Sequence, residues 1–247
     1  DLEARGLHIR YDGSEADTLN GLSFKIRSGE LVAVVGPVGC GKTTLARALG
    51  RMVDVPEGQL FLDRHDLTRL RLTDLRDQIA LVPQEGYLFT SSLADNLRYG
   101  EPEASMERVE AAAEQARLLG DVRGFPDGMN TLVGERGITL SGGQRQRTAL
   151  GRALLVKSPV LVLDDALASV DNNTAAEILA SVRRQTNRTI VMISHQLSAA
   201  AACDRILVLD QGRLVQQGHH SDLIQVPGLY RSLWEREQAA ERLESVA

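Results

Sequence analysis

Hydrophobic residues gather in four short, nearly continuous runs along the chain. The runs are rich in Val, Leu and Ile, and they cover residues 31–36, 159–165, 189–194 and 205–210. Continuous apolar runs of this length are typical of strands that are buried on both faces, as in a parallel sheet. Apolar residues at helical spacing lie between these runs and predict helices at 43–52, 172–185 and 197–202. The pattern therefore predicts an α/β fold, with a mostly parallel sheet covered by helices on both faces.

The start and the middle of the chain follow other patterns. Residues 2–11 and 19–26 are short alternating segments separated by a polar turn, which predicts an antiparallel β part. Helical patterns dominate residues 84–155, so we predict a helical subdomain inserted into the α/β core. Two polar, amphipathic segments near the C-terminus predict terminal helices. The predicted single domain covers residues 1–247, with its core formed by 1–83 and 156–247.

Composition and charge narrow the range of functions. The chain has 28 Lys and Arg residues against 33 Asp and Glu, with both signs interspersed, so we expect no nucleic acid as partner. Two cysteines cannot make a disulfide framework, which favours a reducing, cytosolic setting. No apolar run reaches the ~20 residues of a membrane-spanning helix. The chain opens at Asp1 with neither Met nor a signal peptide, so we expect a piece of a longer protein.

A glycine-rich segment, GPVGCGKT at residues 36–43, follows a predicted buried strand and precedes a predicted helix. It matches the pattern G-x-x-x-x-G-K-[ST], in which backbone N–H groups and a helix N-terminus surround phosphate oxygens. Lys42 would place a cation on the β- and γ-phosphates, and the Thr43 hydroxyl is available to magnesium. The alternative is a glycine-rich turn with a surface lysine, which the order of strand, loop and helix disfavours.

Two further segments carry candidate chemistry. LVLDD, residues 161–165, is a predicted buried strand that ends in two carboxylates. Alone it is typical of a turn or a helix cap, but in a chain with a phosphate-binding loop Asp164 is placed to hold magnesium. LSGGQ, residues 140–144, puts a serine and two glycines at the head of a long predicted helix. It indicates either a second anion-binding helix N-terminus or an ordinary serine cap.

Five segments in order resemble the ATP-binding cassette (ABC) nucleotide-binding domain over essentially the whole chain: GPVGCGKT, LSGGQ, LVLDD, ASVD and a strand ending in SHQ. The resemblance implies ATP and Mg²⁺ as ligands. It implies that the nucleotide is bound by Tyr11, Gly36, Gly39, Cys40, Gly41, Lys42, Thr43, Thr44, Ser141, Gly142, Gly143, Gln144 and Asp171. Cys40 is a variable position of the loop, with no role beyond possible thiol reactivity near the phosphates.

The family pattern also implies individual roles. Tyr11 resembles the aromatic residue that stacks on adenine, and Asp171 the aspartate that couples the two sites of a dimer. Gln84 resembles the glutamine that touches magnesium and the attacking water, and His195 the histidine that contacts the γ-phosphate. The ordinary alternatives are a half-exposed strand tyrosine for Tyr11 and a structural histidine for His195. The implied metal ligands are Thr43, Gln84 and Asp164, and the implied catalytic residues are Asp165, His195 and Gln84.

Asp165 stands where the family usually has Glu, the residue that polarises the attacking water. Its carboxylate lies one methylene nearer the backbone, and a displacement of ~1 Å can cost on the order of a hundredfold in rate. We therefore expect slow hydrolysis, as in the degenerate half of a heterodimeric transporter. His195 is retained here, although that half often loses it. Because family members pair head to tail, the resemblance implies a second, non-identical nucleotide-binding domain with an intact Glu as partner.

TLVGERG, residues 131–137, resembles the exporter segment that lies against the coupling helices of a transmembrane domain; without the resemblance it would be a polar loop. We therefore expect the ATPase domain of an exporter, with a transmembrane domain as its second partner, at the cytoplasmic face of the cell membrane. Two alternatives stay open. One is a soluble ABC ATPase or importer subunit, and the other is a regulatory module whose output is ATP occupancy rather than turnover.

Overall fold

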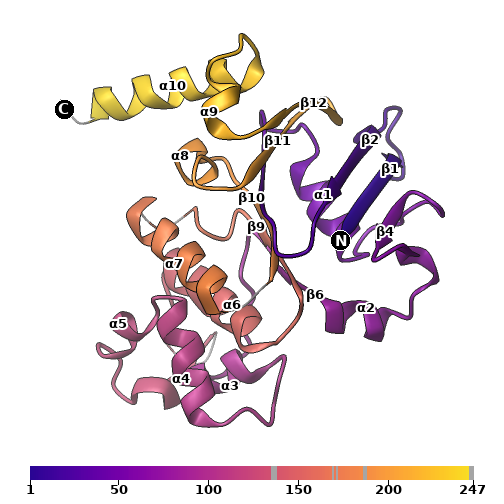
Figure 1. The fold of residues 1–247 in the computed structure, drawn as a ribbon. Coiled ribbons are helices and arrows are strands. Elements are labelled where there is room, and N and C mark those ends of the chain that lie inside the picture. The colour runs from indigo at the N-terminus through magenta and orange to yellow at the C-terminus, as the bar shows by residue number, and fades with distance from the viewer. Residues whose placement is uncertain (135–137, 169, 171, 186–187, 245–247) are drawn as a thin grey trace.

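A six-stranded sheet forms the centre of the molecule (Figure 1). The computed structural model describes residues 1–134, 138–168, 170, 172–185 and 188–244. In spatial order the strands are β12 (Arg213–Gly218), β11 (Arg205–Asp210), β3 (Leu31–Val35), β10 (Thr189–Ile193), β9 (Val160–Asp164) and β6 (Ile79–Val82). All neighbours are parallel except the edge pair of β11 and β12. This mostly parallel sheet confirms the predicted α/β class.

A smaller antiparallel sheet lies beside the central one. Its strands, in spatial order, are β2 (Leu19–Ile26), β1 (Leu2–Ile9), β4 (Leu60–Leu62) and β5 (His65–Asp66). The β1 and β2 pairing agrees with the antiparallel start that the alternating pattern predicts. Strands β4 and β5 were not predicted, because they are too short to show a period of two. A 3-10 turn (Leu67–Arg69) and α2 (Leu72–Gln78) lead back to β6.

Successive side chains of β3 point to opposite faces of the central sheet, and each face has its own core. Val32 and Val34 join the core that contains α1 (Lys42–Leu49), α2 and the antiparallel sheet. Leu31, Ala33 and Val35 join the opposite core. The helices on this second side are α7 (Asn172–Gln185), α8 (Leu197–Ala200), α9 (His220–Leu223) and α10 (Leu229–Glu244).

The helical segment between β6 and β9 has a third core, in which Leu93, Val109 and Leu118 are fully buried. Its elements are β7 (Ser91–Ser92), α3 (Leu93–Arg98), α4 (Met106–Gln115), α5 (Leu119–Val122), a 3-10 turn (Gly128–Asn130), β8 (Leu132–Val133) and α6 (Gly142–Leu155). The pair β7 and β8 corrects the prediction of a purely helical stretch. Helix α6 joins the segment to the sheet, because Leu150 lies in the core on the α7 side of the central sheet and Leu155 lies in the third core.

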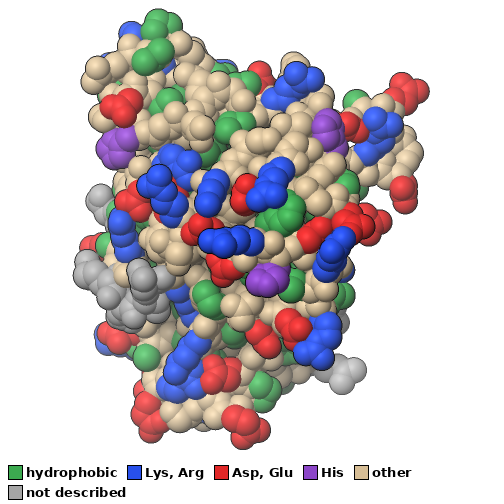
Figure 2. Space-filling model, turned by 45° about the vertical axis from the view of Figure 1, so that its right-hand side comes forward, with side chains coloured by type: hydrophobic (Ala, Val, Ile, Leu, Met, Phe, Trp, Pro, Cys, Tyr) green, Lys and Arg blue, Asp and Glu red, His purple; other side chains and the backbone are tan. Residues whose placement is uncertain are grey.

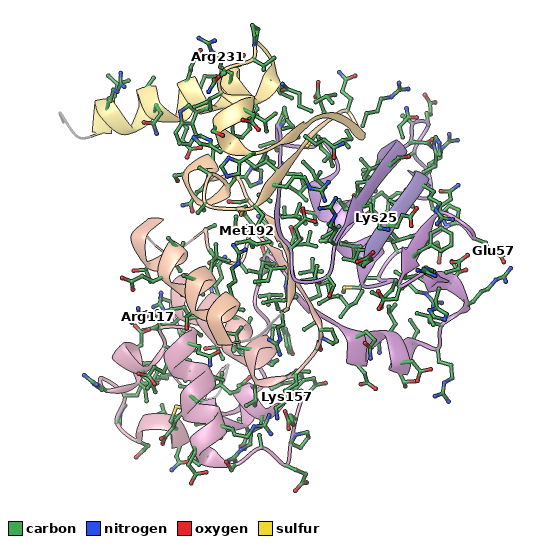
Figure 3. The ribbon with its side chains drawn as sticks, viewed as in Figure 1. Lys25, Glu57, Arg117, Lys157, Met192 and Arg231 are labelled. Carbon is green, nitrogen blue, oxygen red and sulfur yellow. The ribbon has the colours of Figure 1, made fainter. Side chains whose placement is uncertain are left out.

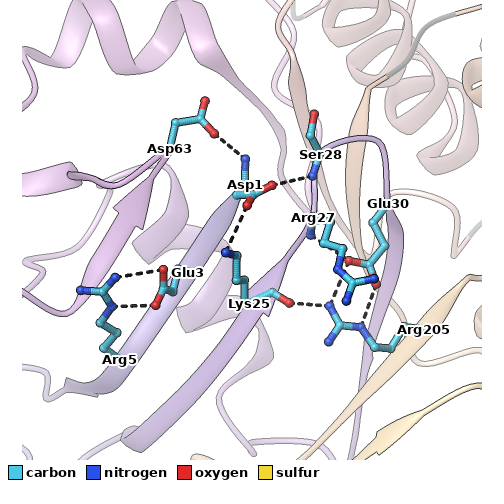
Figure 4. Close-up of polar contacts among 9 residues, drawn as sticks. All are labelled: Asp1, Glu3, Arg5, Lys25, Arg27, Ser28, Glu30, Asp63 and Arg205. Carbon is cyan, nitrogen blue, oxygen red and sulfur yellow. Dashed lines mark hydrogen bonds and ion pairs between the residues drawn. The ribbon is translucent and has the colours of Figure 1, made fainter.

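Arg205 connects the two sheets (Figure 4). Arg205 of β11 donates two hydrogen bonds to the Glu30 carboxylate, at 2.8 and 3.0 Å, and one to the Lys25 carbonyl of β2 at 2.5 Å. Both side chains of the pair are largely buried. The contact links the end of β2 to the start of β3, at the end of the antiparallel sheet where Lys25 pairs with Glu3.

The surface is charged and mixed in sign. Lys, Arg, Asp and Glu side chains are interspersed over the face that Figure 2 shows. In Figure 3, Met192 of β10 lies in the interior, whereas Glu57 and Arg231 lie at the periphery. Within the described part of the chain, none of the helices has both the length and the apolar character needed to span a membrane.

Candidate functional site

The loop between β3 and α1 is shaped by glycines at its two ends. Gly36 and Gly41 have φ angles of 150° and 103°. A Cβ at Gly36 would lie 2.1 Å from the Leu209 carbonyl oxygen, and one at Gly41 would lie 2.8 Å from the Thr18 carbonyl oxygen. Only glycine fits such approaches to backbone atoms. The loop therefore packs against neighbouring chain segments, and α1 begins directly behind it at Lys42.

Lys42 is folded back over this loop. Its side chain is buried, and its Nζ donates hydrogen bonds to the carbonyl oxygens of Gly36 and Pro37, at 2.8 and 2.9 Å. Among the described residues, no carboxylate lies within ion-pair distance of Lys42. Its partners are these two carbonyl oxygens and the Cys40 sulfur at 3.8 Å, all of them uncharged groups, so this position suits an anionic ligand.

Two of the predicted metal ligands, Thr43 and Asp164, meet at the end of β9. The Thr43 Oγ1 hydroxyl donates to Asp164 Oδ1 at 3.2 Å. Burial raises the pKa of the Asp164 carboxyl, and the charge of Asp165 adds to this, while the Thr43 hydrogen bond opposes it. A cation beside Asp164 would offset the cost of its buried charge. Mg²⁺ prefers oxygen ligands, such as those of hydroxyl and carboxylate groups. In nucleotide sites the protein supplies one or two of these ligands, and phosphates and water supply the rest. Thr43 and Asp164 therefore fit Mg²⁺.

Asp165 lies next to His195 at the same edge of the sheet. Asp165 Oδ2 is 3.8 Å from His195 Nε2, and its Oδ1 accepts a hydrogen bond from the His195 backbone N–H at 3.4 Å. The Asp165 side chain is only 10% exposed, whereas that of His195 is 44% exposed. Asp165 has a φ of 52°, a left-handed conformation that Asp tolerates better than most residues with a side chain.

Tyr11 and Gln84 have contacts with residues other than Thr43, Asp164 and Asp165. The Tyr11 hydroxyl is 3.2 Å from Thr44 Oγ1, and its ring is partly exposed beside the start of α1. Gln84 follows β6 by two residues, and its carbonyl accepts a hydrogen bond from Gln146 Nε2 at 3.2 Å. Its side chain is exposed, and no hydrogen bond between described residues joins it to Thr43 or Asp164. Asp171 lies outside the described residues.

The LSGGQ segment forms the head of α6. The Ser141 Oγ accepts from the Gln144 N–H at 3.2 Å, and the Gln144 side chain accepts from the Ser141 N–H at 2.9 Å, which is a complete capping box. Because Ser141 Oγ serves as acceptor here, its O–H remains available as a donor. Ser141 and Gly142 are exposed. Within the described ranges, no hydrogen bond or ion pair joins this segment to the loop at 36–43.

Asp121 of α5 supports this segment, and sequence reasoning missed it. Its Oδ1 accepts from Gln144 Nε2 at 3.3 Å, and its Oδ2 accepts from Arg147 Nη2 at 2.8 Å. Asp121 precedes Ser141 by a long and irregular connection, so no local spacing in the sequence points to the contact. The carboxylate holds two side chains of the first turns of α6 and thereby limits the orientation of the exposed serine.

A buried strand, a glycine-rich loop, a helix that opens on Lys and Thr, and a carboxylate at the end of a nearby parallel strand define a P-loop nucleotide-binding protein. The family model described as "ABC transporter" matches residues 19–168. The chain belongs to the ABC transporter family.

Relatives and a solved structure agree with this assignment. The chain is 43% identical to an ATM1-type heavy metal exporter of Novosphingobium aromaticivorans, over 95% of this chain and 38% of that protein. It is also 43% identical to an ATP-dependent lipid A-core flippase of Photorhabdus laumondii, over 94% of this chain and 40% of that protein. A bacterial Atm1-family ABC exporter with ATP bound superposes with a TM-score of 0.90 at 41% identity, over 96% of this chain and 41% of that one. The chain thus spans about two fifths of the length of these relatives.

Proposed function

We propose that this chain is the ATP-binding and hydrolysing domain of an ABC exporter. The observation that carries the proposal is the meeting of the Thr43 hydroxyl with the Asp164 carboxylate, next in the chain to Lys42, which is buried and, among the described residues, has no carboxylate within ion-pair distance. A cation site next to a phosphate site is what MgATP requires. In the full protein, closure of two such domains around ATP would be coupled to export of a substrate.

Each residue of the site has a part in this function. Lys42 and the N–H groups at the start of α1 bind the phosphates, and Tyr11 stacks on the adenine. Thr43 and Asp164, with Gln84, hold Mg²⁺, which neutralises phosphate charge when it is bound. Asp165 orients the attacking water and accepts its proton. His195 donates a hydrogen bond toward the γ-phosphate from its exposed position beside Asp165.

The signature segment acts on a second domain in this proposal. Ser141 and Gly142 are exposed and are not joined to the chain's own P-loop among the described residues, yet the capping box orients Ser141, and Asp121 holds the Gln144 side chain that completes the box. A preorganised donor group is effective where charge must be stabilised. We therefore infer a head-to-tail dimer, in which Ser141, Gly142, Gly143 and Gln144 face the γ-phosphate bound by the partner, with Asp171 near the contact between the two sites.

Asp165 favours a non-identical partner. One oxygen of its shorter side chain accepts a hydrogen bond from the His195 N–H at 3.4 Å, and the other lies 3.8 Å from His195 Nε2, so the carboxylate lies at the His195 side of the site. Hydrolysis at this site is then slow, while the complete LSGGQ segment serves the partner's site. The partner would carry the usual Glu at the position of Asp165. The exporter is thus a heterodimer with one slow site and one fast site.

Exposed apolar side chains mark a surface for the transmembrane domain. Tyr87 and Tyr99, on either side of α3, are 68% and 60% exposed, and Leu132 of β8 is 45% exposed. Gly134 packs against Thr90, so the start of the TLVGERG segment lies beside the one that carries Tyr87; residues 135–137 lie outside the described ranges. We infer that coupling helices dock here, at the cytoplasmic face of the cell membrane.

The transported substrate is set by the part of the protein beyond this chain. The two relatives are named for a heavy metal and for lipid A-core, although both are 43% identical to this chain. The same motor domain therefore serves unrelated cargoes, and recognition of the cargo belongs to the transmembrane domain.

Steady-state MgATP turnover of the wild-type chain and of D165E, at high protein concentration, tests the proposal. We expect slow turnover of the wild type and a rise of about a hundredfold in D165E, because the longer side chain reaches the water position. The matched control is D63E, which makes the same change at a residue with a similar φ of 47°, far from the site. An equal rise in D63E would contradict the assignment of Asp165 as the brake. No rise in D165E would mean either that the chain does not pair with itself or that the brake lies elsewhere, and the assay would then be repeated with the non-identical partner.

The Asp165 contacts also favour a second candidate, a regulatory module whose output is ATP occupancy. A carboxylate held against His195 permits tight binding without turnover. Single-turnover hydrolysis distinguishes the two functions: product that forms over minutes to hours supports the slow ATPase, whereas bound ATP that stays intact supports the regulatory module.

A further inference from the structure

The C-terminal helix α10 lies outside the part of the chain that the family model matches, yet it packs against the site. Tyr230 is fully buried, and Leu229, Leu233 and Trp234 pack on the core at the α7 side of the central sheet. In Figure 1, α10 extends from α9 on the same side of the sheet as α8. Helix α8 directly follows His195. The end of the chain therefore adjoins the segment that presents the histidine of the nucleotide site.

Glu237 of α10 caps the N-terminus of α8. Its two carboxylate oxygens accept hydrogen bonds from the backbone N–H groups of Leu197 and Ser198, at 2.8 and 3.0 Å. The residue at the N-cap position, Gln196, makes no capping hydrogen bond with its own side chain. The first N–H groups of a helix need an acceptor, and a carboxylate is the best one because the helix dipole favours it. Here the acceptor comes from forty residues further along the chain.

Side chains accept the hydrogen bonds of four consecutive backbone N–H groups, those of residues 195–198. The N–H of His195 donates to Asp165, and that of Gln196 donates to Ser194 Oγ at 2.9 Å. Those of the next two residues donate to Glu237. The segment that carries His195 is thus held between two carboxylates, Asp165 on the sheet side and Glu237 on the α10 side.

The imidazole has room to move in front of the P-loop. A pocket of about 460 Å³ is bordered by Pro37 and Val38 of the P-loop, by His195, and by Leu233 and Glu237 of α10. Because the imidazole borders open space, its position depends on the backbone from which it projects. Among the described residues, the N–H groups of that backbone donate to the two carboxylates and to Ser194.

We propose that Glu237 is a positioning residue for His195: it orders the backbone of residues 195–198 so that the imidazole meets the γ-phosphate. The inference rests on the proposed function, because it needs His195 to contact the nucleotide. It makes α10 a part of the ATP site, through which events at the C-terminus act on hydrolysis.

The test compares E237A, E237Q and H195A in the full chain, with E235Q as the matched control. Glu235 lies on the same helix and is paired only with the exposed Arg231. The readouts are the rate of single-turnover hydrolysis, the ratio of ATP to ADP affinity, and amide hydrogen exchange at residues 195–198. Gln retains one acceptor oxygen, so E237Q should lie between wild type and E237A, and it covers the case in which E237A folds poorly.

We expect E237A to exchange faster at residues 195–198, to hydrolyse ATP about tenfold more slowly, and to lose preference for ATP over ADP. The change in H195A should be at least as large. Adding E237A to H195A should then change hydrolysis by less than about twofold, because residues that act as a unit are not additive. E235Q should behave as wild type.

Three results would overturn the inference. They are unchanged exchange in E237A, faster exchange with wild-type hydrolysis and ATP preference, and an equal effect of E237A with and without His195. Failure of the proposed function has a different signature, because the wild type and E235Q would then form no product. In that case the ratio of ATP to ADP affinity tests the positioning role. If E237A loses the preference for ATP, and adding E237A to H195A causes no further loss, the positioning role is supported. If E237A leaves the ratio unchanged, the positioning role is overturned.

Discussion

The P-loop and the signature segment each lie at the N-terminus of a helix, where an anion would bind, but they differ in whether the remaining parts of the site lie in the same chain. At the P-loop, Lys42 is buried and Thr43 bonds to Asp164 on a distant strand, so the parts of one ligand site come together within the chain. At the signature segment, Ser141 is exposed and its contacts serve only to hold it still. In the proposed function, the first region is a site completed within the chain, and the second is half of a contact whose other half comes from a second domain.

The largest effect should come from removing the cation of the P-loop. K42A deletes the ammonium group and leaves the Gly36 and Pro37 carbonyls without its hydrogen bonds. Charge-assisted hydrogen bonds contribute about 1.5–3 kcal/mol each, so affinity for ATP should fall by about a hundredfold. Titration with a fluorescent ATP analogue measures this. The control K25A removes an exposed lysine paired with Asp1 and should bind as wild type; equal affinities for K42A and wild type would remove Lys42 from the site.

Mixing two inactive variants tests whether the two regions belong to one composite site. In the D165E background, K42A has no working P-loop and S141R has no working signature, so each alone should lack turnover. A mixed head-to-tail dimer holds one intact site, so an equal mixture should recover about a quarter of the parent turnover. Turnover assays of the separate and mixed chains measure this.

A mixture as inactive as its components would contradict pairing of the P-loop with the signature of another copy. The control is a mixture of K42A with K42A/S141R, which contains no P-loop that works and should stay inactive. S141R also removes a helix cap worth about 1 kcal/mol, so the fold of each variant is checked by its melting temperature.

The comparison also shows which features are visible in a sequence. The strands β3, β9, β10 and β11 were predictable because full burial makes them continuous apolar runs. Strand β12 was not, because it lies at a sheet edge, where the sequence RLVQQG is half polar and its residues alternate between exposed and half-buried. An edge strand is stabilised by pairing with its neighbour more than by burial, and pairing leaves little trace in local composition.

The site divides in the same way. Lys42, Thr43 and Asp164 lie in two compact segments whose spacing follows from backbone geometry, so the sequence could place them. Asp121 and Glu237 act on backbone and side chains that are far away in the chain. Their roles follow only from tertiary packing, because a lone carboxylate on an amphipathic helix is usually a solvated surface charge.

A smaller effect should follow from loosening the signature segment without touching it. In D121N the amide nitrogen replaces one acceptor oxygen, so Asn cannot accept from both Gln144 and Arg147. Turnover in the D165E background should fall by about threefold to tenfold through misplacement of Ser141, while ATP binding by the chain stays unchanged. E177Q, which breaks the exposed pair with Arg117, is the control and should have no effect. A loss of ATP binding in D121N would instead place its effect at the P-loop.

The smallest effect concerns stability rather than turnover. Burial raises the pKa of Asp164, so the folded domain without ligands binds a proton there more readily than the unfolded chain does. Its ionised carboxylate therefore destabilises the fold at neutral pH, and this cost disappears as the pH falls toward the ordinary value of 3.8. D164N should thus melt a few degrees higher than wild type at pH 7 with chelator present, since about 1 kcal/mol shifts the melting temperature by 2–4 °C at this size. The difference should shrink as the pH is lowered toward 3.8.

Asp66 supplies a control of opposite sign. Burial tends to raise its pKa, but hydrogen bonds from the N–H groups of Thr68 and Gly58 outweigh this and lower it. Its ionised form stabilises the fold above the unfolded pKa, and this contribution is lost as the pH falls through the folded pKa. D66N should therefore melt below wild type at pH 7, where D164N melts above it. The two Asp→Asn variants should therefore shift the melting temperature in opposite directions, which distinguishes a carboxylate that binds a ligand from one that stabilises the fold. A lower melting temperature in D164N than in the wild type would contradict the ligand role of Asp164.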